Sequence, residues 1–271
     1  MANLKELRLR ISSVKNTRKI TAAMSQIASA RLKKAQDAVT AAKPYGDRMR
    51  EVIESLVSGI EASERGAAHP LLEQRKVERE LLLVMTADRG LCGGFNTNIA
   101  KLARAEIKRL RDAGKTVKIL TIGKKGNDAL KRQYGQLIVG HIDRRAERSV
   151  TAESAARVAR EITDRFDRAE FDVATLVFAR FKNLLTQVPT ALQLIPAKAP
   201  ADAPVVDLQG ARYIYEPSEE AILETLLPRY LGTQLLSALL ETEAGFQGSQ
   251  MTAMDNATRN AGDMIKSLQL R

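Results

Sequence analysis

The chain has 271 residues, of which 44% are hydrophobic and only 4% aromatic, with no tryptophan. Lysine and arginine outnumber the acidic residues by 43 to 32, which gives a net charge of +11 and points to an anionic partner: nucleic acid, an anionic membrane or an acidic protein surface. A single cysteine, Cys92, excludes an internal disulfide and a cysteine-rich metal site, and no apolar run reaches the ~18 residues of a membrane span. We therefore expect a soluble protein of a reducing compartment.

Residues 4–60 are predicted to form one long basic helix. Apolar residues recur there in steps of three and four, at Ile20, Met24, Ile27/Ala28, Leu32, Ala35, Val39, Ala42, Tyr45, Met49, Val52/Ile53, Leu56 and Ile60. This spacing is typical of a coiled-coil seam, and such a helix extends about 80 Å, beyond the ~50 Å diameter of a compact chain of this size. We therefore expect it to protrude and to need a partner, with a kink but no end at Pro44.

Residues 1–60 hold 12 Lys and Arg and 5 acids, so more than half of the net charge lies on this helix. Residues 1–36 carry one acid, Glu6, as a transit peptide would. The apolar spacing continues through this stretch, however, and we interpret it as part of the mature helix.

The middle of the chain alternates short apolar runs with amphipathic stretches. We expect strands at residues 80–87, 117–122, 136–139, 171–181 and 187–195, and helices at residues 97–112, 125–134 and 151–166. Alternating strands and helices predict an α/β domain with a largely parallel sheet, and Pro189 indicates an edge position for the last of these strands.

A second long helix is predicted at the C-terminal end. A proline-containing loop at residues 196–204 and a short strand near residues 212–215 precede it, and Ser218 is its expected N-cap. Pro228, Gly232, Gly245 and Gly248 should interrupt it locally. The expected fold class is α/β: a long antiparallel coiled coil of terminal helices, residues 1–62 and 217–271, with a central Rossmann-like α/β domain, residues 63–216.

Two glycine-containing loops between a strand and a helix could suggest a nucleotide site. Gly90-Leu-Cys-Gly-Gly94 and Gly123-Lys-Lys-Gly126 lack the spacing of dinucleotide-binding or phosphate-binding loops, and a tight turn accounts for both. An ion pair between Asp88 and Arg89 is a further hypothesis for the first turn. No nucleophile lies near a base in the sequence, so we predict no catalytic residue, no cofactor and no metal.

Several strings together resemble one family, the gamma subunit of the F-type ATP synthase. They are Ile11-Ser-Ser-Val-Lys-Asn-Thr-Arg-Lys-Ile-Thr21, Ala23-Met24, Thr86-Ala-Asp-Arg-Gly-Leu-Cys-Gly-Gly-Phe-Asn96, Gln187-Val-Pro-Thr190, Tyr215-Glu-Pro217 and Met251-Thr-Ala-Met-Asp-Asn-Ala-Thr-Arg-Asn-Ala261. They occur in the family's order and spacing over essentially the whole chain.

The resemblance implies a rotor in which the terminal helices form a central shaft inside a hexamer of alpha and beta subunits. The α/β domain would contact the epsilon subunit and the c-ring of the membrane sector. Rotation would couple proton translocation to ATP synthesis or hydrolysis at the beta-subunit sites. The chain would then be a non-catalytic, peripheral subunit at the cytoplasmic face of the bacterial inner membrane, without a transmembrane segment or a nucleic-acid partner.

The resemblance also assigns contact residues by position. On the first helix these are Met24, Arg31, Lys33 and Lys34, which would face acidic levers of the beta subunit; on the opposite strand of the shaft they are Ala257, Asn260 and Leu268. Three features of the chain depart from the family. The family usually continues past Leu270, and it has a Ser-Glu pair and an Arg where this chain has Gly245-Phe246 and Gln250. It also commonly has a second Met where this chain has Gln26. The glycine at position 245 implies a weakened stretch of the second helix, and an end at Arg271 would imply that the upper bearing contact is missing.

Two other functions remain open from the residues. A basic coiled-coil scaffold that binds nucleic acid would use the same lysines and arginines to neutralise phosphates. A nucleotide-using α/β enzyme would use the glycine-containing loops.

Overall fold

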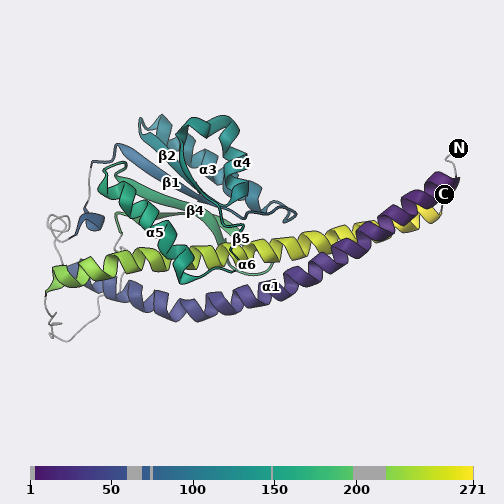
Figure 1. Cartoon of the computed structure of the whole chain (residues 1–271), viewed down its shortest axis with the longest axis horizontal. Helices are drawn as coiled ribbons and strands as arrows, with labels where there is room; N and C mark the ends of the chain where they lie inside the picture. The colour runs from purple at the N-terminus through teal and green to yellow at the C-terminus, as the bar shows by residue number, and fades with distance from the viewer. Residues whose placement is uncertain (1–3, 60–68, 74–75, 148, 198–217, 271) are drawn as a thin grey trace.

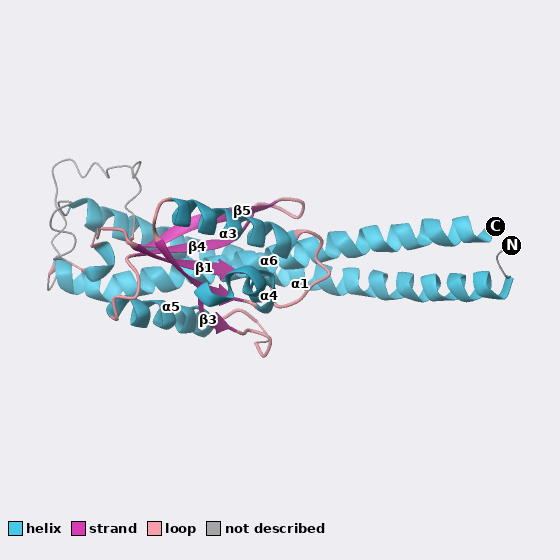
Figure 2. Ribbon diagram, turned by 90° about the horizontal axis from the view of Figure 1, so that it is seen from above, coloured by secondary structure: helices cyan, strands magenta, loops and turns pink. Residues whose placement is uncertain are grey.

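The computed structural model describes residues 4–59, 69–73, 76–147, 149–197 and 218–270. A sheet domain lies along one half of two long helices, α1 (Leu4–Gly59) and α6 (Glu219–Gln269), which project together beyond it (Figure 1). Seen from above, the first turns of α1 and the last turns of α6 lie side by side at the projecting end (Figure 2). The predicted fold class, terminal helices paired antiparallel beside an α/β domain, is confirmed. We call residues 4–30 of α1 and 250–269 of α6 the shaft.

The two helices meet along a heptad seam. The seam side chains of α1 are buried or half-buried and follow steps of three and four, apart from an exposed Arg18: Leu7, Ile11, Val14, Thr21, Ser25, Ala28, Leu32, Ala35, Val39, Ala42, Gly46, Met49, Ile53 and Leu56. On the shaft part of α6 they are Met254, Thr258, Ala261, Ile265 and Leu268. This alternation is the geometry of a left-handed coiled coil.

The predicted seam is wrong at three positions of α1. Ile20 and Tyr45 are 60% and 58% exposed, and Met24 is half-buried, whereas the residues that follow each of them, Thr21, Ser25 and Gly46, occupy the seam. The prediction selected apolar residues, but the seam accepts two hydroxyl groups and a glycine at these positions. Ile60 lies outside the described residues.

Both helices continue through residues that disfavour helix. Pro44 lies inside α1, as predicted, but α6 runs without interruption through Pro228, Gly232, Gly245 and Gly248, so the predicted local breaks are wrong. The physical reason is packing at two of the glycines. A Cβ atom at Gly245 would lie 2.8 Å from the ring of Phe95, and one at Gly248 would lie 3.4 Å from Leu184. Close approach to the sheet domain outweighs a helix-propensity cost of about 1 kcal/mol per glycine.

The described residues form a five-stranded sheet in the order β3-β2-β1-β4-β5. Its strands are β1 (Arg79–Met85), β2 (Thr116–Ile122), β3 (Ile138–Ile142), β4 (Val173–Phe181) and β5 (Gln187–Ile195). The first four are parallel, and β5 joins β4 antiparallel at an edge, which confirms the largely parallel sheet and the edge position of Pro189. The strand predicted at residues 136–139 begins later, because a 3-10 turn, η2 (Gly135–Leu137), precedes it.

Helices cover both faces of the sheet. Leu82 and Val84 of β1 pack with α3 (Phe95–Asp112), and on the same face lies α4 (Lys124–Tyr134). The alternate residues Leu81, Leu83 and Met85 face α5 (Ala152–Asp167) and the lower half of the α1–α6 pair. Since β1 is buried on both faces, its near-continuous apolar sequence is explained. A short 3-10 helix, η1 (Pro70–Leu72), precedes β1.

Ser218 caps α6 as predicted, its hydroxyl accepting a hydrogen bond of 3.3 Å from the amide of Ala221. The strand predicted near residues 212–215 lies outside the described residues. So do the predicted domain boundaries, after residues 62 and 216, and the division into three parts stays a prediction.

Asp172 joins the starts of β1 and β4. Its buried carboxylate accepts hydrogen bonds from the amides of Glu78 (3.0 Å) and Arg79 (2.8 Å) and pairs with the Arg79 guanidinium at 2.7 Å. Burial is the largest single influence and raises the pKa of Asp172, but these donors together outweigh it and hold the pKa below 3.8. A carboxyl group whose pKa is lower in the folded than in the unfolded state stabilises the folded protein. This stabilisation is complete at pH values above the pKa of the unfolded state and is lost as the pH falls through the pKa of the folded state.

We expect Asp172→Asn to lower the free energy of unfolding by about 2 kcal/mol near neutral pH, because charge-assisted hydrogen bonds are lost. The difference from wild type should shrink in acid, where Asp172 itself becomes protonated. Urea unfolding at a series of pH values measures this. Asp164→Asn, at an exposed position of α5, is the control; equal losses in the two variants would contradict the assignment.

The seam assignment predicts different costs for two neighbouring apolar residues. Leu32→Ala removes a side chain that is 6% exposed and should cost about 2 kcal/mol or more, whereas Ile27→Ala, at 53% exposure, should cost less than about 0.5 kcal/mol. Thermal or urea unfolding of the full chain distinguishes them. Equal destabilisation would place Ile27 in the seam.

Candidate functional site

The α1 side of the shaft and its base is strongly basic. Residues 4–34 contain nine lysines and arginines, all exposed, against one acid, Glu6. On the α6 side, Arg259 and Lys266 are balanced by Asp255 and Asp263. The positive charge therefore lies on one side of the helix pair, and the shaft is electrostatically asymmetric about its long axis.

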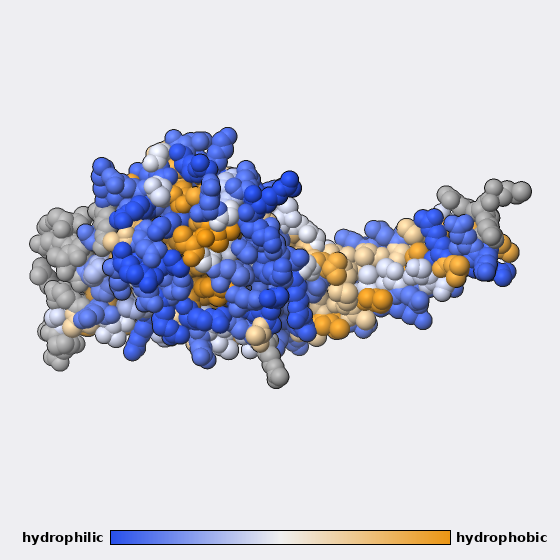
Figure 3. Space-filling model, turned by 45° about the horizontal axis from the view of Figure 1, so that its top comes forward, coloured by the Kyte–Doolittle hydropathy of each residue, from blue (hydrophilic) through white to orange (hydrophobic). Residues whose placement is uncertain are grey.

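Large apolar side chains also face outward from the shaft. Leu4, Leu9, Ile20 and Ile27 of α1 are 63%, 65%, 60% and 53% exposed, and Met264 of α6 is 46% exposed. Figure 3 shows apolar surface, in orange, interspersed with polar surface along the projecting helices. Exposed apolar residues grouped beside charges are typical of surfaces that contact another protein.

One stripe of α1 combines both properties. Ile20, Met24, Ile27, Arg31 and Lys34 follow each other in steps of four and three, so they lie on one face of the helix. Each precedes a seam residue, and the stripe therefore lies next to the seam and outside it. We call these five residues the outer stripe. The apolar spacing that the sequence analysis took for the seam at residues 20–27 belongs to this stripe.

The sequence-predicted contact residues are brought together only in part. Met24, Arg31 and Lys34 share the outer stripe, and Lys33 is exposed on a different side of α1. Asn260 of α6 is exposed and Ala257 is half-buried. Leu268 is only 6% exposed and lies in the seam, where it packs toward α1.

The base of the shaft is fixed to the sheet domain. Leu32 and Ala35 of α1 pack with Ala244 of α6, and Leu184, from the loop between β4 and β5, packs against them. Ser249 donates a hydrogen bond of 2.7 Å to the Gln187 side chain. The rings of Phe95 and Phe246 meet edge to face with centroids 6.3 Å apart. These contacts lie where α6 passes from the domain into the shaft.

A half-buried carboxylate supports the same junction. Glu241 of α6 accepts a hydrogen bond of 2.9 Å from the amide of Phe181, at the end of β4, and burial raises its pKa. Sequence reasoning missed this contact and those of Gln187 and Ser249, because none follows from helix or strand periodicity.

The sequence analysis also missed the polar residues of the shaft seam. The hydroxyl groups of Thr21 and Thr258 are 2.7 Å apart, and Ser25 donates a hydrogen bond of 2.5 Å to Asp255. Extending the spacing of Ala28, Leu32 and Ala35 toward the N-terminus without regard to polarity would have found Thr21 and Ser25.

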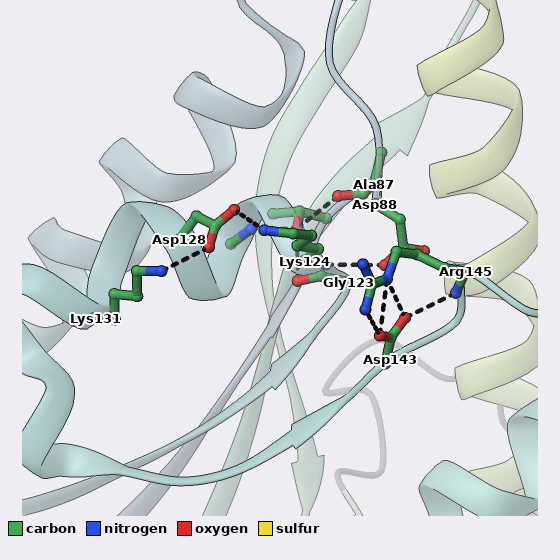
Figure 4. Close-up of polar contacts among 10 residues, drawn as sticks. Ala87, Asp88, Gly123, Lys124, Asp128, Lys131, Asp143 and Arg145 are labelled. Atoms are coloured by element: carbon green, nitrogen blue, oxygen red, sulfur yellow. Dashed lines mark hydrogen bonds and ion pairs between the residues drawn. The ribbon is translucent and has the colours of Figure 1, made fainter.

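The carboxyl edge of the sheet, where nucleotides bind in many α/β folds, is filled by the chain itself (Figure 4). The first three amides of α4 point at oxygen atoms of the loop after β1. Lys124 donates to the Asp88 carboxylate at 2.9 Å, Lys125 to the Ala87 carbonyl at 3.2 Å, and Gly126 to the Thr86 hydroxyl at 2.7 Å. These amides are the donors that a phosphate would need.

Asp88 thus bonds to the first amide of α4 from a neighbouring loop, while Gly123 is the N-cap residue, and the predicted ion pair with Arg89 is not found among the described residues. Charged side chains near this edge are paired with each other. Asp128 accepts hydrogen bonds from Lys124 at 2.7 Å and Lys131 at 3.0 Å, which lower its pKa to about 2, and Arg145 pairs with Asp143. Figure 4 shows both pairs.

Comparison with known proteins gives consistent matches over the whole chain. A sequence model of the family described as ATP synthase matches residues 3–271. The ATP synthase gamma chain of Hyphomonas neptunium is 54% identical over 272 residues, and that of Dinoroseobacter shibae is 51% identical over 270 residues; each match covers 100% of this chain and 92% of the relative.

Solved structures share the fold. A chain of the central stalk and c-ring of the Tetrahymena thermophila mitochondrial ATP synthase superposes with a TM-score of 0.65 at 23% identity, over 88% of this chain and 99% of that one. A rotor chain of the Euglena gracilis enzyme gives 0.63 at 14% identity, over 98% and 94%. The matched length and the identity of the relatives show that this chain belongs to the ATP synthase gamma chain family.

Proposed function

We propose that this chain is the central-stalk subunit of an F1Fo ATP synthase, a rotating shaft that couples proton translocation to ATP synthesis or hydrolysis. The observation that carries the proposal is the shaft, whose α1 part is about 40 Å long and whose α6 part is about 30 Å long, and which has a basic and apolar outer surface. Its partners are the alpha and beta subunits around the shaft, and the epsilon subunit and c-ring at the domain.

In this proposal the chain is peripheral, at the cytoplasmic face of the bacterial inner membrane. A bilayer-spanning stretch is not found among the helices that the structure describes. The chain itself is non-catalytic, and ATP is made and cleaved in the beta subunits. The amides of α4 that bond to the loop after β1 support this, since they leave no free donors at that helix end for a phosphate.

The asymmetry of the shaft suggests how it acts. Three identical beta subunits around a shaft with charge on one side meet a different surface at each angle of rotation. A contact that is stronger with one conformation than with another shifts the population toward it, by an amount set by the difference in contact free energy. Turning the shaft therefore changes which beta subunit is favoured in which conformation, without any chemistry in this chain.

The proposed contact residues divide into two groups. Met24, Arg31 and Lys34 of the outer stripe, with Lys33 beside it and Ala257 and Asn260 on α6, would face the surrounding subunits. Leu268 would act from the seam, by holding the tip of α6 against α1.

Co-purification tests the proposal directly. The full chain, expressed with the alpha subunit and a tagged beta subunit, should be recovered in a complex with ATPase activity, because the shaft needs the collar of subunits to cover its apolar side chains. Failure of the full chain to assemble would contradict the proposed function.

Charge reversal separates coupling from assembly. We expect Arg31→Glu with Lys33→Glu and Lys34→Glu to reduce ATP-driven proton pumping by membranes at least tenfold while the complex still assembles. The reason is that the acidic levers of beta would meet like charge. Lys101→Glu with Lys108→Glu and Arg111→Glu, on the exposed face of α3, is the matched control. Equal loss of pumping and assembly would mean that the basic cluster only holds the complex together.

Membership of the gamma chain family does not support the nucleic-acid-binding scaffold, and the filled end of α4 argues against a nucleotide-using enzyme. We expect ATP, AMP or NADH to shift the melting temperature of the isolated chain by less than about 1 °C, as expected without specific binding to the folded state. A shift of several degrees would show a nucleotide site and would count against a purely mechanical role.

A further inference from the structure

Polar residues interrupt the seam in the middle of the shaft. On α1 they are Arg18, Thr21 and Ser25, which occupy consecutive seam positions, and they meet Gly262, Thr258 and Asp255 of α6. Thr21 and Ser25 are each 8% exposed. A Cβ atom at Gly262 would lie 3.8 Å from the guanidinium carbon of Arg18, so this glycine leaves room for the arginine to lie across α6. We call these six residues the polar seam.

Burial of apolar surface does not explain this arrangement. In the same part of α1, Ile20 and Ile27 have large apolar side chains that stay more than half exposed, while two hydroxyl side chains are buried next to them. Turning this stretch by one residue, about 100°, would bring Ile20, Met24 and Ile27 against α6 and would expose the hydroxyls. Apolar burial alone favours that turned arrangement.

The hydrogen bonds supply the opposing preference. The Ser25 hydroxyl meets the Asp255 carboxylate at 2.5 Å, in the range of charge-assisted O–H···O bonds, which are about twice as strong as neutral ones. The Thr21 and Thr258 hydroxyls meet at 2.7 Å one turn away. Turning α1 would break both contacts at once, and sliding it along α6 would leave the buried Thr21 and Ser25 hydroxyls without these partners. Polar groups at seam positions of coiled coils fix register in the same way, at a cost in stability.

We propose that the polar seam sets the register and rotation of the two shaft helices, and so keeps the outer stripe with Met24 turned away from α6. Ser25, Asp255, Thr21 and Thr258 are positioning residues in this view. Their contacts across the seam decide which side chains of α1 are turned outward, where a surrounding subunit can contact them. That consequence for coupling rests on the proposed function, whereas the register itself is a property of the chain.

Distances between spin labels on the full chain test the register. The labels go on cysteines introduced at Arg10 and Asn256, both exposed, in a chain whose own buried Cys92 is replaced by alanine. In this background we expect a single distance. Asp255→Leu should add a second distance or replace the first, because the polar partners are lost and a rotation of α1 by one residue, about 100°, carries the label at position 10 to another side of the helix. Asp255→Asn keeps an acceptor oxygen in place and should retain the original distance.

Asp263→Leu makes the same chemical change at a position of α6 that is 78% exposed, and should leave the distance unchanged. If the Asp255→Leu chain loses helical circular dichroism, the Ser25→Ala chain is measured in its place. This variant removes only the hydrogen-bond donor, and it should broaden or shift the distance between the labels. An unchanged distance in the variant that folds, or an equal change in Asp255→Asn, would overturn the proposal.

The outcome also separates this inference from the proposed function. A register that shifts as expected, in a wild-type chain that never assembles with alpha and beta subunits, would overturn the function and leave the positioning role intact.

Discussion

The structure depends on the contact between two helices from opposite ends of the chain. Thr21 and Thr258 meet although 237 residues separate them, and the seam that contains them continues down into the main core, where Ile53 and Leu56 pack with Leu223. A contact between residues so far apart in the chain carries a large entropy cost of loop closure, and an ordered domain between them reduces that cost. The parallel sheet between the helices is thus the support on which the shaft is assembled, and the shaft ties the sheet domain to both ends of the chain.

The carboxyl edge of the sheet illustrates how a fold can resemble an enzyme without having its site. In a nucleotide-binding α/β protein, free amides at a helix end receive a phosphate. Here Asp88 and Thr86 give oxygen atoms to the same amides, and Gly123 lies so close to Thr86 that a Cβ atom would be 2.1 Å from its carbonyl oxygen. Gly123 and Gly126 serve close packing between the end of β1 and the start of α4, and they do not form an open phosphate loop.

Sequence patterns were sufficient for the order of the elements but not for their finer contacts. The parallel sheet, its edge strand with Pro189 and the pairing of the terminal helices follow from periodicity and turn residues. The seam near Ile20 was misplaced because hydrophobic spacing cannot tell a face turned toward the partner helix from one turned toward another protein. Of the contact residues inferred from family resemblance, Met24 and Arg31 share a stripe, but the burial of Leu268 required the three-dimensional register.

The glycines of α6 have a mechanical consequence. At Gly245 and Gly248 the helix comes within contact distance of Phe95 and Leu184, and it continues unbroken from the sheet domain into the shaft. Torque applied to the domain therefore enters the shaft through a single continuous backbone clamped at its side, and not through a flexible hinge. Glycines weaken an isolated helix, but here they let α6 pack tightly against the domain and so make the connection stiff. Elastic twisting is then confined to the shaft, where the two helices project beyond the domain.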